Sequence, residues 1–403
     1  MLQLYKSDAK LKGHINLSSS KSESNRVLLM NALSQSPFEL TNLSDAKDTQ
    51  TMIRLLQEDT EVWDVREAGT TMRFCTAYLG VHGKGQTITG TERMKNRPIG
   101  TLVDALRTLG SDISYLEKEG YPPMKINGLK IQKTREISIP GNISSQFISA
   151  LLMIAPTLPE GLRLTLTEEI FSRPYIEMTL GLMSNFGIAY IWEGAVIDIA
   201  PQAYQSGKYQ VESDWSGASY WYAMAAVAPN ADLLLTGLKE KSFQGDQAIV
   251  EIMRAFGVDS AYESNGVRLT QNGQQVTTLT IDFNKCPDLA QGVMVAAALK
   301  GITLTMKGLE TLYIKETDRV GAMRNELAKI GASLSDLGDT WILKPGNGAF
   351  SEPTIETYED HRMAMAFGPL SLVSDLKIEE PGVVSKSYPG YWEDLKRVGI
   401  RME

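Results

Sequence analysis

The chain has 403 residues, of which 43% are hydrophobic and 22% are charged, as is typical of a globular protein with two or three domains. Its 40 basic and 48 acidic side chains give a net charge of −8, which argues against a surface that binds nucleic acid or anionic membranes. The N-terminal segment MLQLYKSDAK lacks the apolar region of a signal peptide and no apolar run approaches about 18 residues, so we expect a cytoplasmic protein.

Six nearly all-apolar helices are predicted along the chain: VLLMNAL, TMRFCTAYLG, FISALLMIA, ASYWYAMAAVA, LAQGVMVAAAL and MAMAFGPLSLV. A helix that is apolar on every face must be buried. Its first N–H groups have no partner within the helix and carry partial positive charge, so several such ends directed at one place form a site for anions. The six helices open on small, hydroxyl, amide or charged residues: Lys21-Ser22, Gly69-Thr70, Ser144-Ser145-Gln146, Ser216-Gly217, Pro287-Asp288 and Asp360-His361-Arg362.

A second, amphipathic helix type alternates with the buried one, in RPIGTLVDALRTLG, RPYIEMTLGLMSNFG, DQAIVEIMRAFG and TDRVGAMRNELAKIG. Each of these segments ends on a glycine suited to the left-handed position after a helix, namely Gly110, Gly187, Gly257 and Gly331. A short strand-like alternation follows each glycine, in SDISYL, IAYIW, VDSAY and ASLSDL.

The spacing of the buried helices indicates an internal repeat. They begin near residues 22, 70, 145, 216, 287 and 361, which gives steps of 48, 75, 71, 71 and 74 residues. A unit of about 70 residues with two helices and several strands therefore fills the chain, unless the periodicity arises by chance. The short first step leaves room for only one strand, TEVWDV, after the helix-like DAKDTQTMIRLLQED, so the first unit has lost a strand pair.

Six units suggest an α/β protein with two domains of three units each. We place one domain at residues 20–212 and assemble the other from residues 1–19 and 213–403. Two chain crossings, near 18–20 and 212–214, connect these domains, and a hinge is expected there.

Clusters of cations and hydroxyls mark several of the helix openings. Ser20–Arg26 combines two cations with three hydroxyls, although a solvated helix cap explains this segment equally well. In Glu67–Arg73, a glycine permits close approach of the backbone to a ligand. Arg97 precedes a proline at the start of a predicted helix.

Three further clusters lie in the C-terminal half. The KETDR segment, Lys315–Arg319, is the densest, although Thr317 or Asp318 is also suited to a simple helix cap. Asp360-His361-Arg362 directly precedes a buried run, where a satisfied structural pair is the alternative to a site. Lys386 stands beside hydroxyls in a loop-like stretch.

Other common chemistries find no support in the sequence. It contains no GxxxxGKS or GxxxxGKT phosphate loop, no GxGxxG and no HExxH. Three histidines and two cysteines at unrelated spacings argue against a metal site, and we expect no cofactor. Cys75 and Cys286 lie in apolar surroundings typical of buried thiols.

Taken together, the motifs resemble those of the 5-enolpyruvylshikimate-3-phosphate (EPSP) synthase family. Nine motifs follow the family's order over almost the whole chain: SKSESNR, AGTTMR, RMKNRPIG, SSQF, SRPYI, Pro287-Asp288, KETDR, DHRMAM and KSYPGYWEDL. The resemblance implies the family's fold, with three βαββαβ units in each of two domains and buried parallel helices whose N-termini face a cleft. It also implies the family's reaction, transfer of the enolpyruvyl group of phosphoenolpyruvate to the 5-hydroxyl of shikimate 3-phosphate, in aromatic amino acid biosynthesis.

The resemblance also carries over the family's site residues, position by position. Shikimate 3-phosphate contacts fall on Lys21, Ser22, Arg26, Ser144, Ser145, Gln146, Ser172, Tyr175, Asp288 and Lys315. Phosphoenolpyruvate contacts fall on Lys21, Gly69, Arg97, Gln146, Arg319, Arg362 and Lys386. Candidates for proton transfer are Asp288, Glu316 and Lys386, with Lys21 close by, and the sequence does not divide the steps among them.

Both substrates of this family are polyanions, so bringing them together requires cations and helix dipoles. The cations divide between the two expected domains. We therefore expect a polyanion to close the cleft between them, in a protein that acts as a monomer. The family resemblance further implies that the herbicide glyphosate occupies the phosphoenolpyruvate site.

Three residues depart from the family's usual pattern: Glu67 stands for an Asn, Phe74 for a Pro, and Thr311 for an Asn. Together with the shortened first unit, they bear on affinity and inhibitor response rather than on the reaction class.

Two alternatives remain at this point. One is the related enolpyruvyl transferase for UDP-N-acetylglucosamine, whose usual loop cysteine has no counterpart here. The other is an inactive relative kept as a binding module, although the expected cations Lys21, Arg97, Lys315, Arg319, Arg362 and Lys386 are all present.

Overall fold

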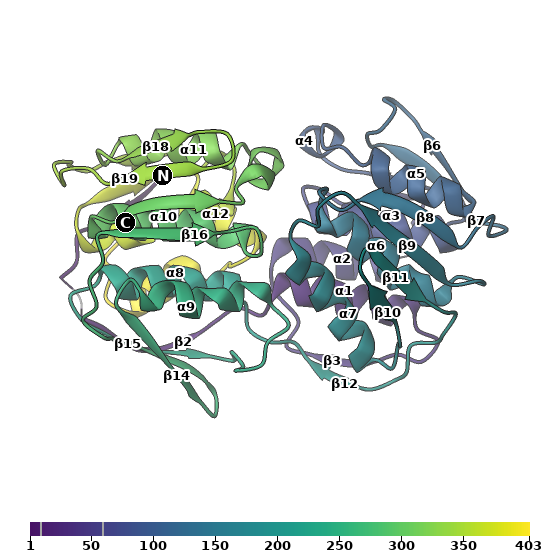
Figure 1. The fold of residues 1–403 in the computed structure, drawn as a ribbon, viewed down its shortest axis with the longest axis horizontal. Helices are drawn as coiled ribbons and strands as arrows, with labels where there is room; N and C mark the ends of the chain where they lie inside the picture. Colours follow the sequence, from purple (N-terminus) through teal and green to yellow (C-terminus); the bar gives the residue numbers. More distant parts are fainter. Residues whose placement is uncertain (9, 59) are drawn as a thin grey trace. The chain divides into compact units, whose positions relative to one another are not determined.

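The computed structural model describes residues 1–8, 10–58 and 60–403. The chain folds into two units, Met1–Ser20 with Glu212–Glu403 (unit 1) and Lys21–Val211 (unit 2). Each unit encloses its own hydrophobic core. In Figure 1, unit 2 is drawn in purple to blue-green, and most of unit 1 in green to yellow.

Unit 2 alternates helices with short strands. Its helices are α1 (Lys21–Leu33), α2 (Lys47–Gln57), α3 (Gly69–His82), α4 (Glu92–Lys95), α5 (Gly100–Leu109), α6 (Ser145–Ile154) and α7 (Arg173–Asn185). Its strands are β3 (Glu39–Thr41), β4 (Val62–Asp64), β5 (Gln86–Thr89), β6 (Ser111–Tyr115), β7 (Met124–Leu129), β8 (Glu136–Pro140), β9 (Leu162–Thr167), β10 (Ile191–Glu193), β11 (Val196–Ile199) and β12 (Lys208–Gln210).

Unit 1 has the same kinds of element. Its helices are α8 (Trp215–Val227), α9 (Ile249–Arg254), α10 (Ala290–Lys300), α11 (Arg319–Ala328), α12 (His361–Ala366) and α13 (Tyr391–Arg397). Its strands are β1 (Leu2–Leu4), β2 (Leu11–Asn16), β13 (Ala231–Thr236), β14 (Val258–Glu263), β15 (Gly266–Gln271), β16 (Thr278–Asp282), β17 (Thr303–Lys307), β18 (Ser333–Asp336), β19 (Trp341–Lys344), β20 (Thr354–Ile355) and β21 (Leu376–Ile378).

Four sheets share one plan, a parallel pair of strands followed by an antiparallel hairpin. Their orders are β4-β5-β7-β6, β10-β11-β9-β8, β14-β15-β13-β2 and β16-β17-β19-β18. Parallel neighbours cannot be joined by a tight turn, so a helix must cross over between them. The buried helices α3, α6 and α10 make this crossover between β4 and β5, β8 and β9, and β16 and β17.

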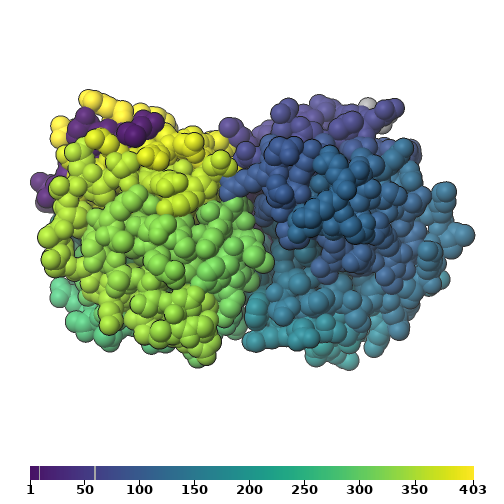
Figure 2. All heavy atoms as spheres, turned by 90° about the horizontal axis from the view of Figure 1, so that it is seen from above, coloured from purple at the N-terminus to yellow at the C-terminus, as the bar shows by residue number. Residues whose placement is uncertain are grey.

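The two remaining sheets are smaller. In unit 2, β3 and β12 form a two-stranded sheet within residues 10–58 and 60–403, in agreement with the lost strand pair predicted for the first repeat. In unit 1, β20 and β21 are parallel and β1 adds antiparallel to β21, with Leu2 opposite Ile378. The N-terminal strand therefore completes the last repeat, and purple N-terminal atoms lie beside yellow C-terminal atoms in Figure 2.

The two predicted helix types are confirmed. Every residue of α8 from Gly217 to Ala226 is buried, as an all-apolar helix requires. The four glycines after the amphipathic helices all have positive φ, such as 115° at Gly110, where an L side chain would be strained.

Three predicted elements are shorter than their patterns suggest. The sequence predicts one helix over the run MAMAFGPLSLV, but α12 ends at Ala366 and a 3₁₀ turn, Gly368–Leu372, follows. Pro369 has no N–H to continue the α-helical ladder. The DQAIVEIMRAFG helix begins as a 3₁₀ turn, Gly245–Ala248, and the IAYIW strand is reduced to β10. Within the described residues, no helix is long and apolar enough to cross a membrane.

Candidate active site

Arg319 is the centre of a buried ionic cluster in unit 1. It is the first residue of α11, a helix that Asp318 caps by accepting a hydrogen bond from Gly321 N at 2.9 Å. The Arg319 side chain is only 2% exposed and donates to three carboxylates. Its Nε lies 2.8 Å from Asp360 Oδ2, its Nη1 3.0 Å from Asp288 Oδ1, and its Nη2 2.7 Å from Glu316 Oε2.

Arg362 approaches the same Asp288 from another helix, α12. Its Nη2 donates to Asp288 Oδ2 at 2.9 Å, and its Nη1 donates to the Asp288 carbonyl at 3.3 Å. Asp360 caps α12 by accepting from Arg362 N at 2.8 Å. The predicted helix openings of the KETDR, Pro287-Asp288 and DHR segments therefore meet within unit 1.

The charges of this cluster determine the ionisation of Asp288. Burial alone raises the pKa of its carboxyl, but Arg362, Lys315 and Arg319 together hold the pKa well below its usual range. The hydrogen bonds that Asp288 accepts from Arg319 and Arg362 favour its carboxylate form. Lys315 lies farther away than the arginines, with Nζ 3.9 Å from Asp288 Oδ1.

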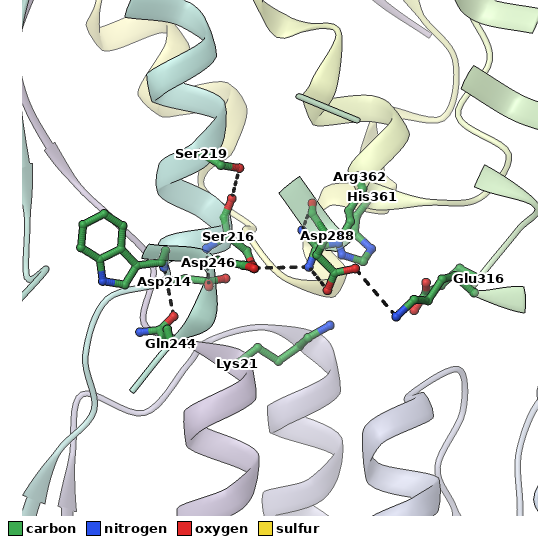
Figure 3. A network of polar contacts seen from close by, with 12 residues as sticks. Lys21, Asp214, Ser216, Ser219, Gln244, Asp246, Asp288, Glu316, His361 and Arg362 are labelled. Atoms are coloured by element: carbon green, nitrogen blue, oxygen red, sulfur yellow. Dashed lines mark hydrogen bonds and ion pairs between the residues drawn. The ribbon is translucent and has the colours of Figure 1, made fainter. Parts of the chain in front are cut away.

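Two further residues lie beside the cluster: Ser216, which the sequence marks only as part of a helix opening, and Asp246, which it does not single out. Ser216 Oγ donates a hydrogen bond to Asp246 Oδ2 and accepts one from Arg362 Nη2 at 3.4 Å (Figure 3). Asp246 is 4% exposed, and burial followed by the charge of Asp288 raises its pKa to about 7. A single acid at a helix start is usually a cap, so only the tertiary fold reveals this carboxyl.

Lys386 and Thr311 are two further residues of unit 1 that the sequence singles out. Lys386 ends a 3₁₀ turn, Pro381–Lys386, and its Nζ donates to the Glu359 carbonyl at 3.2 Å. The Thr311 hydroxyl is buried and finds no hydrogen-bond partner in the part of the chain that the structure describes. Lys386 therefore contacts the segment that leads into α12, and Thr311 lies in the 3₁₀ turn Glu310–Ile314, directly before Lys315.

In unit 2, four helix N-termini bring together most of the expected residues. Gln146, in the first turn of α6, donates from Nε2 to Thr70 Oγ1 of α3 at 3.0 Å. Arg26 of α1 donates from Nη2 to Ser149 Oγ of α6 at 3.2 Å and to the Tyr175 carbonyl of α7 at 3.4 Å. The first turns of α1, α3, α6 and α7 therefore lie at one end of unit 2, where their partial positive charges add.

Arg26 is a buried cation whose hydrogen bonds run to neutral oxygens. Its Nε donates to Thr179 Oγ1 at 2.8 Å and its Nη1 to the Ser22 carbonyl at 2.8 Å. Burial lowers the pKa of its guanidinium to about 10. Phe74, which stands in place of the family's proline, places its ring 5.5 Å from Arg26 Cζ. This cation–π contact partly compensates for the missing water.

The remaining expected residues of unit 2 lie at the same helix starts. Lys21 begins α1, and its Nζ lies 3.4 Å from Asp48 Oδ2. Ser144 caps α6 by accepting from Gln146 N at 3.4 Å, and Ser145 begins that helix. Ser172 precedes α7 with a left-handed φ of 53°, and its carbonyl accepts from Tyr175 N.

Gly69 and Arg97 lie in direct contact. A Cβ added at Gly69 would come within 2.5 Å of Arg97 Nη1, so glycine leaves the room that this guanidinium occupies. Glu67, two residues earlier, is exposed.

The two cysteines are buried, as predicted. Burial raises the pKa of the Cys286 thiol to about 12 and also raises that of Cys75. In the part of the chain that the structure describes, no three His, Cys, Asp or Glu side chains are arranged to hold a metal ion.

The chain is thus a two-unit α/β protein with polar and charged residues gathered at helix starts in each unit. Solved structures of EPSP synthase from Acinetobacter baumannii share the fold. Two of them match with TM-scores of 0.82 and 0.80, at 21% identity, over 100% of this chain and 99% of theirs.

The sequence comparisons specify the family. The family model of EPSP synthase (3-phosphoshikimate 1-carboxyvinyltransferase) matches residues 5–62 and 55–395, so the chain belongs to the EPSP synthase family. The 3-phosphoshikimate 1-carboxyvinyltransferase of Bacteroides fragilis is 49% identical over 404 residues, 99% of this chain and 98% of that one. The protein of the same name from Aliivibrio salmonicida is 36% identical over 97% of this chain and 98% of its own length.

Proposed function

We propose that this chain is a 3-phosphoshikimate 1-carboxyvinyltransferase, which transfers the enolpyruvyl group of phosphoenolpyruvate to the 5-hydroxyl of shikimate 3-phosphate and releases phosphate. Its family and its full-length relatives of that name support the activity. The structural observation that carries the proposal is the contact of Asp288 with both Arg319 and Arg362. This contact combines a carboxylate with two cations, the groups that the reaction requires.

The binding residues form two sets in this proposal. Shikimate 3-phosphate is held by Lys21, Ser22, Arg26, Ser144, Ser145, Gln146, Ser172, Tyr175, Asp288 and Lys315. Phosphoenolpyruvate is held by Lys21, Gly69, Arg97, Gln146, Arg319, Arg362 and Lys386. Each set contains cations and residues at helix N-termini, which together offset the repulsion between two phosphorylated substrates.

The reaction proceeds by addition and elimination. The 5-hydroxyl adds to C2 of phosphoenolpyruvate while C3 gains a proton, and the tetrahedral adduct then loses a C3 proton and phosphate. Asp288 accepts the proton of the attacking hydroxyl in this scheme. Glu316 and Lys386 transfer protons to and from C3 and to the departing phosphate. Lys21 is a further cation that binds the phosphate groups of the substrates. No cofactor or metal enters the scheme.

A phosphate-release assay tests the activity. Purified protein is given phosphoenolpyruvate with shikimate 3-phosphate, and separately phosphoenolpyruvate with UDP-N-acetylglucosamine. We expect release only with the first acceptor. Release with the second acceptor would identify the related transferase, and release with neither would indicate an inactive relative.

The proposal also covers the compartment, oligomeric state and partners of the enzyme. We infer that it works as a cytoplasmic monomer that binds small molecules and neither nucleic acid nor membranes. Light scattering coupled to size-exclusion chromatography tests the monomer, for which the expected mass is 44.4 kDa.

A further inference from the structure

Asp246 is a buried carboxyl beside the proposed site to which the reaction scheme gives no role. It lies in the 3₁₀ turn Gly245–Ala248, ahead of α9. Its Oδ2 accepts a hydrogen bond from Ser216 Oγ, whereas its Oδ1 is buried and has no hydrogen-bond partner among the described residues. A buried oxygen that lacks a donor is costly for an ionised carboxylate, and it is an available place for a proton.

The Ser216 hydroxyl connects Asp246 to Arg362. Ser216 lies in the first turn of α8, where Asp214 Oδ1 accepts from its backbone N at 3.0 Å and fixes it in place. Arg362 Nη2 donates both to Ser216 Oγ at 3.4 Å and to Asp288 Oδ2 at 2.9 Å. One hydroxyl therefore separates Asp246 from a guanidinium of the proposed phosphoenolpyruvate site (Figure 3).

We propose that Asp246 is a positioning residue for phosphoenolpyruvate: through the Ser216 hydroxyl its carboxylate holds Arg362 while no anion is bound, and the carboxyl takes up a proton from solvent when phosphoenolpyruvate binds that arginine. The inference rests on the proposed function. It gives Asp246 a role through Arg362 and no contact with substrate.

The surrounding charges give the sign of this effect. The charged and titratable groups facing Asp246 are Asp214 before α8, Cys286 and Asp288 before α10, and Arg362 of α12. Burial and Asp288 raise the pKa of Asp246 to about 7, while Arg362 opposes them. A bound anion adds negative charge and engages Arg362, so both changes raise the pKa further. Anion binding and proton uptake therefore favour each other.

The test is the pH dependence of the KM for phosphoenolpyruvate, measured at saturating shikimate 3-phosphate. If the anion binds only when Asp246 is protonated, the KM of the wild-type enzyme rises up to about tenfold from pH 6 to pH 8 through this carboxyl. Asp246→Asn is permanently neutral and should lose that part of the rise. Phosphoenolpyruvate changes its own ionisation over this range and affects both enzymes equally. We therefore compare, at each pH, the ratio of the wild-type KM to the KM of Asp246→Asn.

Ser216 provides a second, independent variant. Ser216→Ala removes the connecting hydroxyl but keeps the carboxyl, so the KM for phosphoenolpyruvate should rise several-fold while the KM for shikimate 3-phosphate stays the same. Ser216→Thr keeps a hydroxyl, so its KM for phosphoenolpyruvate should equal that of the wild-type enzyme. If Asp246→Asn does not fold, as judged by circular dichroism, this pair still decides whether the connection exists.

Glu326→Gln is the matched control. Glu326 is a fully buried carboxyl of the same unit, bonded to Lys329 and Tyr358. Its variant should follow the wild-type pH profile. An unchanged KM ratio in Asp246→Asn, or an unchanged KM in Ser216→Ala, would overturn the proposal in an enzyme that is active. Absence of wild-type phosphate release would instead overturn the proposed function itself.

Discussion

Arg362 Nη2 lies 2.9 Å from Asp288 Oδ2, so a cation expected to bind phosphoenolpyruvate is paired with a carboxylate expected to accept a proton. While this pair is intact, the pKa of Asp288 stays well below its usual range and the carboxylate is a weak base. An anion that engages Arg362 weakens the pair and raises the pKa of Asp288. We infer that substrate binding itself makes Asp288 a better base.

The acids are tested by amide substitution. Asp288→Asn and Glu316→Gln keep the size of the side chain but remove its capacity to transfer protons. Both variants should still bind shikimate 3-phosphate in calorimetry, while turnover falls by about 10²-fold or more, the usual contribution of a positioned acid or base.

A matched control separates this effect from a general loss of charge. Asp339→Asn changes an exposed acid outside the ionic cluster and should leave turnover unchanged. If Asp288→Asn or Glu316→Gln has the turnover of the wild-type enzyme, that residue does not transfer protons and is only a structural partner of Arg319.

The arginines are tested by lysine, which keeps the charge but loses the planar fork. Arg362 donates from both terminal nitrogens to Asp288, and a lysine at this position has a single nitrogen to replace them. We expect Arg362→Lys and Arg97→Lys to lose at least about tenfold in kcat/KM, equivalent to about 1.4 kcal/mol of transition-state stabilisation. Steady-state kinetics like those of the wild type would remove the substituted arginine from the site.

Gly69 is tested by adding a single methyl group. In Gly69→Ala, the new Cβ would lie 2.5 Å from Arg97 Nη1, and the flexible arginine must move away. The protein should therefore fold normally, with a raised KM for phosphoenolpyruvate and an unchanged KM for shikimate 3-phosphate. In Gly80→Ala, a methyl is added within the same helix, α3, against Leu106, and it should change neither constant. Equal effects of the two substitutions would contradict a specific role for the contact between Gly69 and Arg97.

The expected closure of the enzyme is tested in solution. The proposed phosphoenolpyruvate cations belong to different units, with Lys21 and Arg97 in unit 2 and Arg319, Arg362 and Lys386 in unit 1. A polyanion that attracts both sets favours a closed state. Saturation with shikimate 3-phosphate and glyphosate should lower the radius of gyration in small-angle scattering, compared with sodium chloride at equal ionic strength. An unchanged radius, with binding of both ligands confirmed by calorimetry, would exclude closure.

The sequence predicts the positions of the helices well for two reasons. An all-apolar helix must be buried, and the polar residues at its start are visible in the local sequence. It therefore places Asp288, Arg319 and Arg362 at helix starts that do meet in unit 1. Their roles remain predictions.

Contacts between distant segments are beyond such local signals. Ser216 and Asp246 are 30 positions apart, and their contact depends on how α8 packs against the turn before α9. The apolar pattern does not indicate the break after Ala366, because it continues through Gly368 and Pro369, although proline cannot continue the helix. Hydrophobic periodicity therefore predicted burial better than it predicted helix length.

The ionisation of Asp246 also predicts a pH-dependent stability. Burial raises the pKa of its carboxyl to about 7 in the folded protein, whereas an unfolded aspartate titrates near about 3.9. The folded state thus binds more protons than the unfolded state between these values, so this group lowers the free energy of unfolding as pH rises through that window. Asp288, whose pKa lies well below its usual range, stays ionised and contributes a constant amount from pH 5 to pH 8.

Asp246→Asn removes the penalty of ionising this buried group. The melting temperature of the variant, relative to that of the wild type, should therefore increase from pH 5 to about pH 7 and level off above it. Differential scanning calorimetry at constant ionic strength measures the two melting temperatures, with Asp339→Asn as the baseline for an exposed acid. A difference that does not change between pH 5 and pH 8 would mean that Asp246 is already ionised in the folded protein at pH 5, and the proton uptake proposed for phosphoenolpyruvate binding would lose its physical basis.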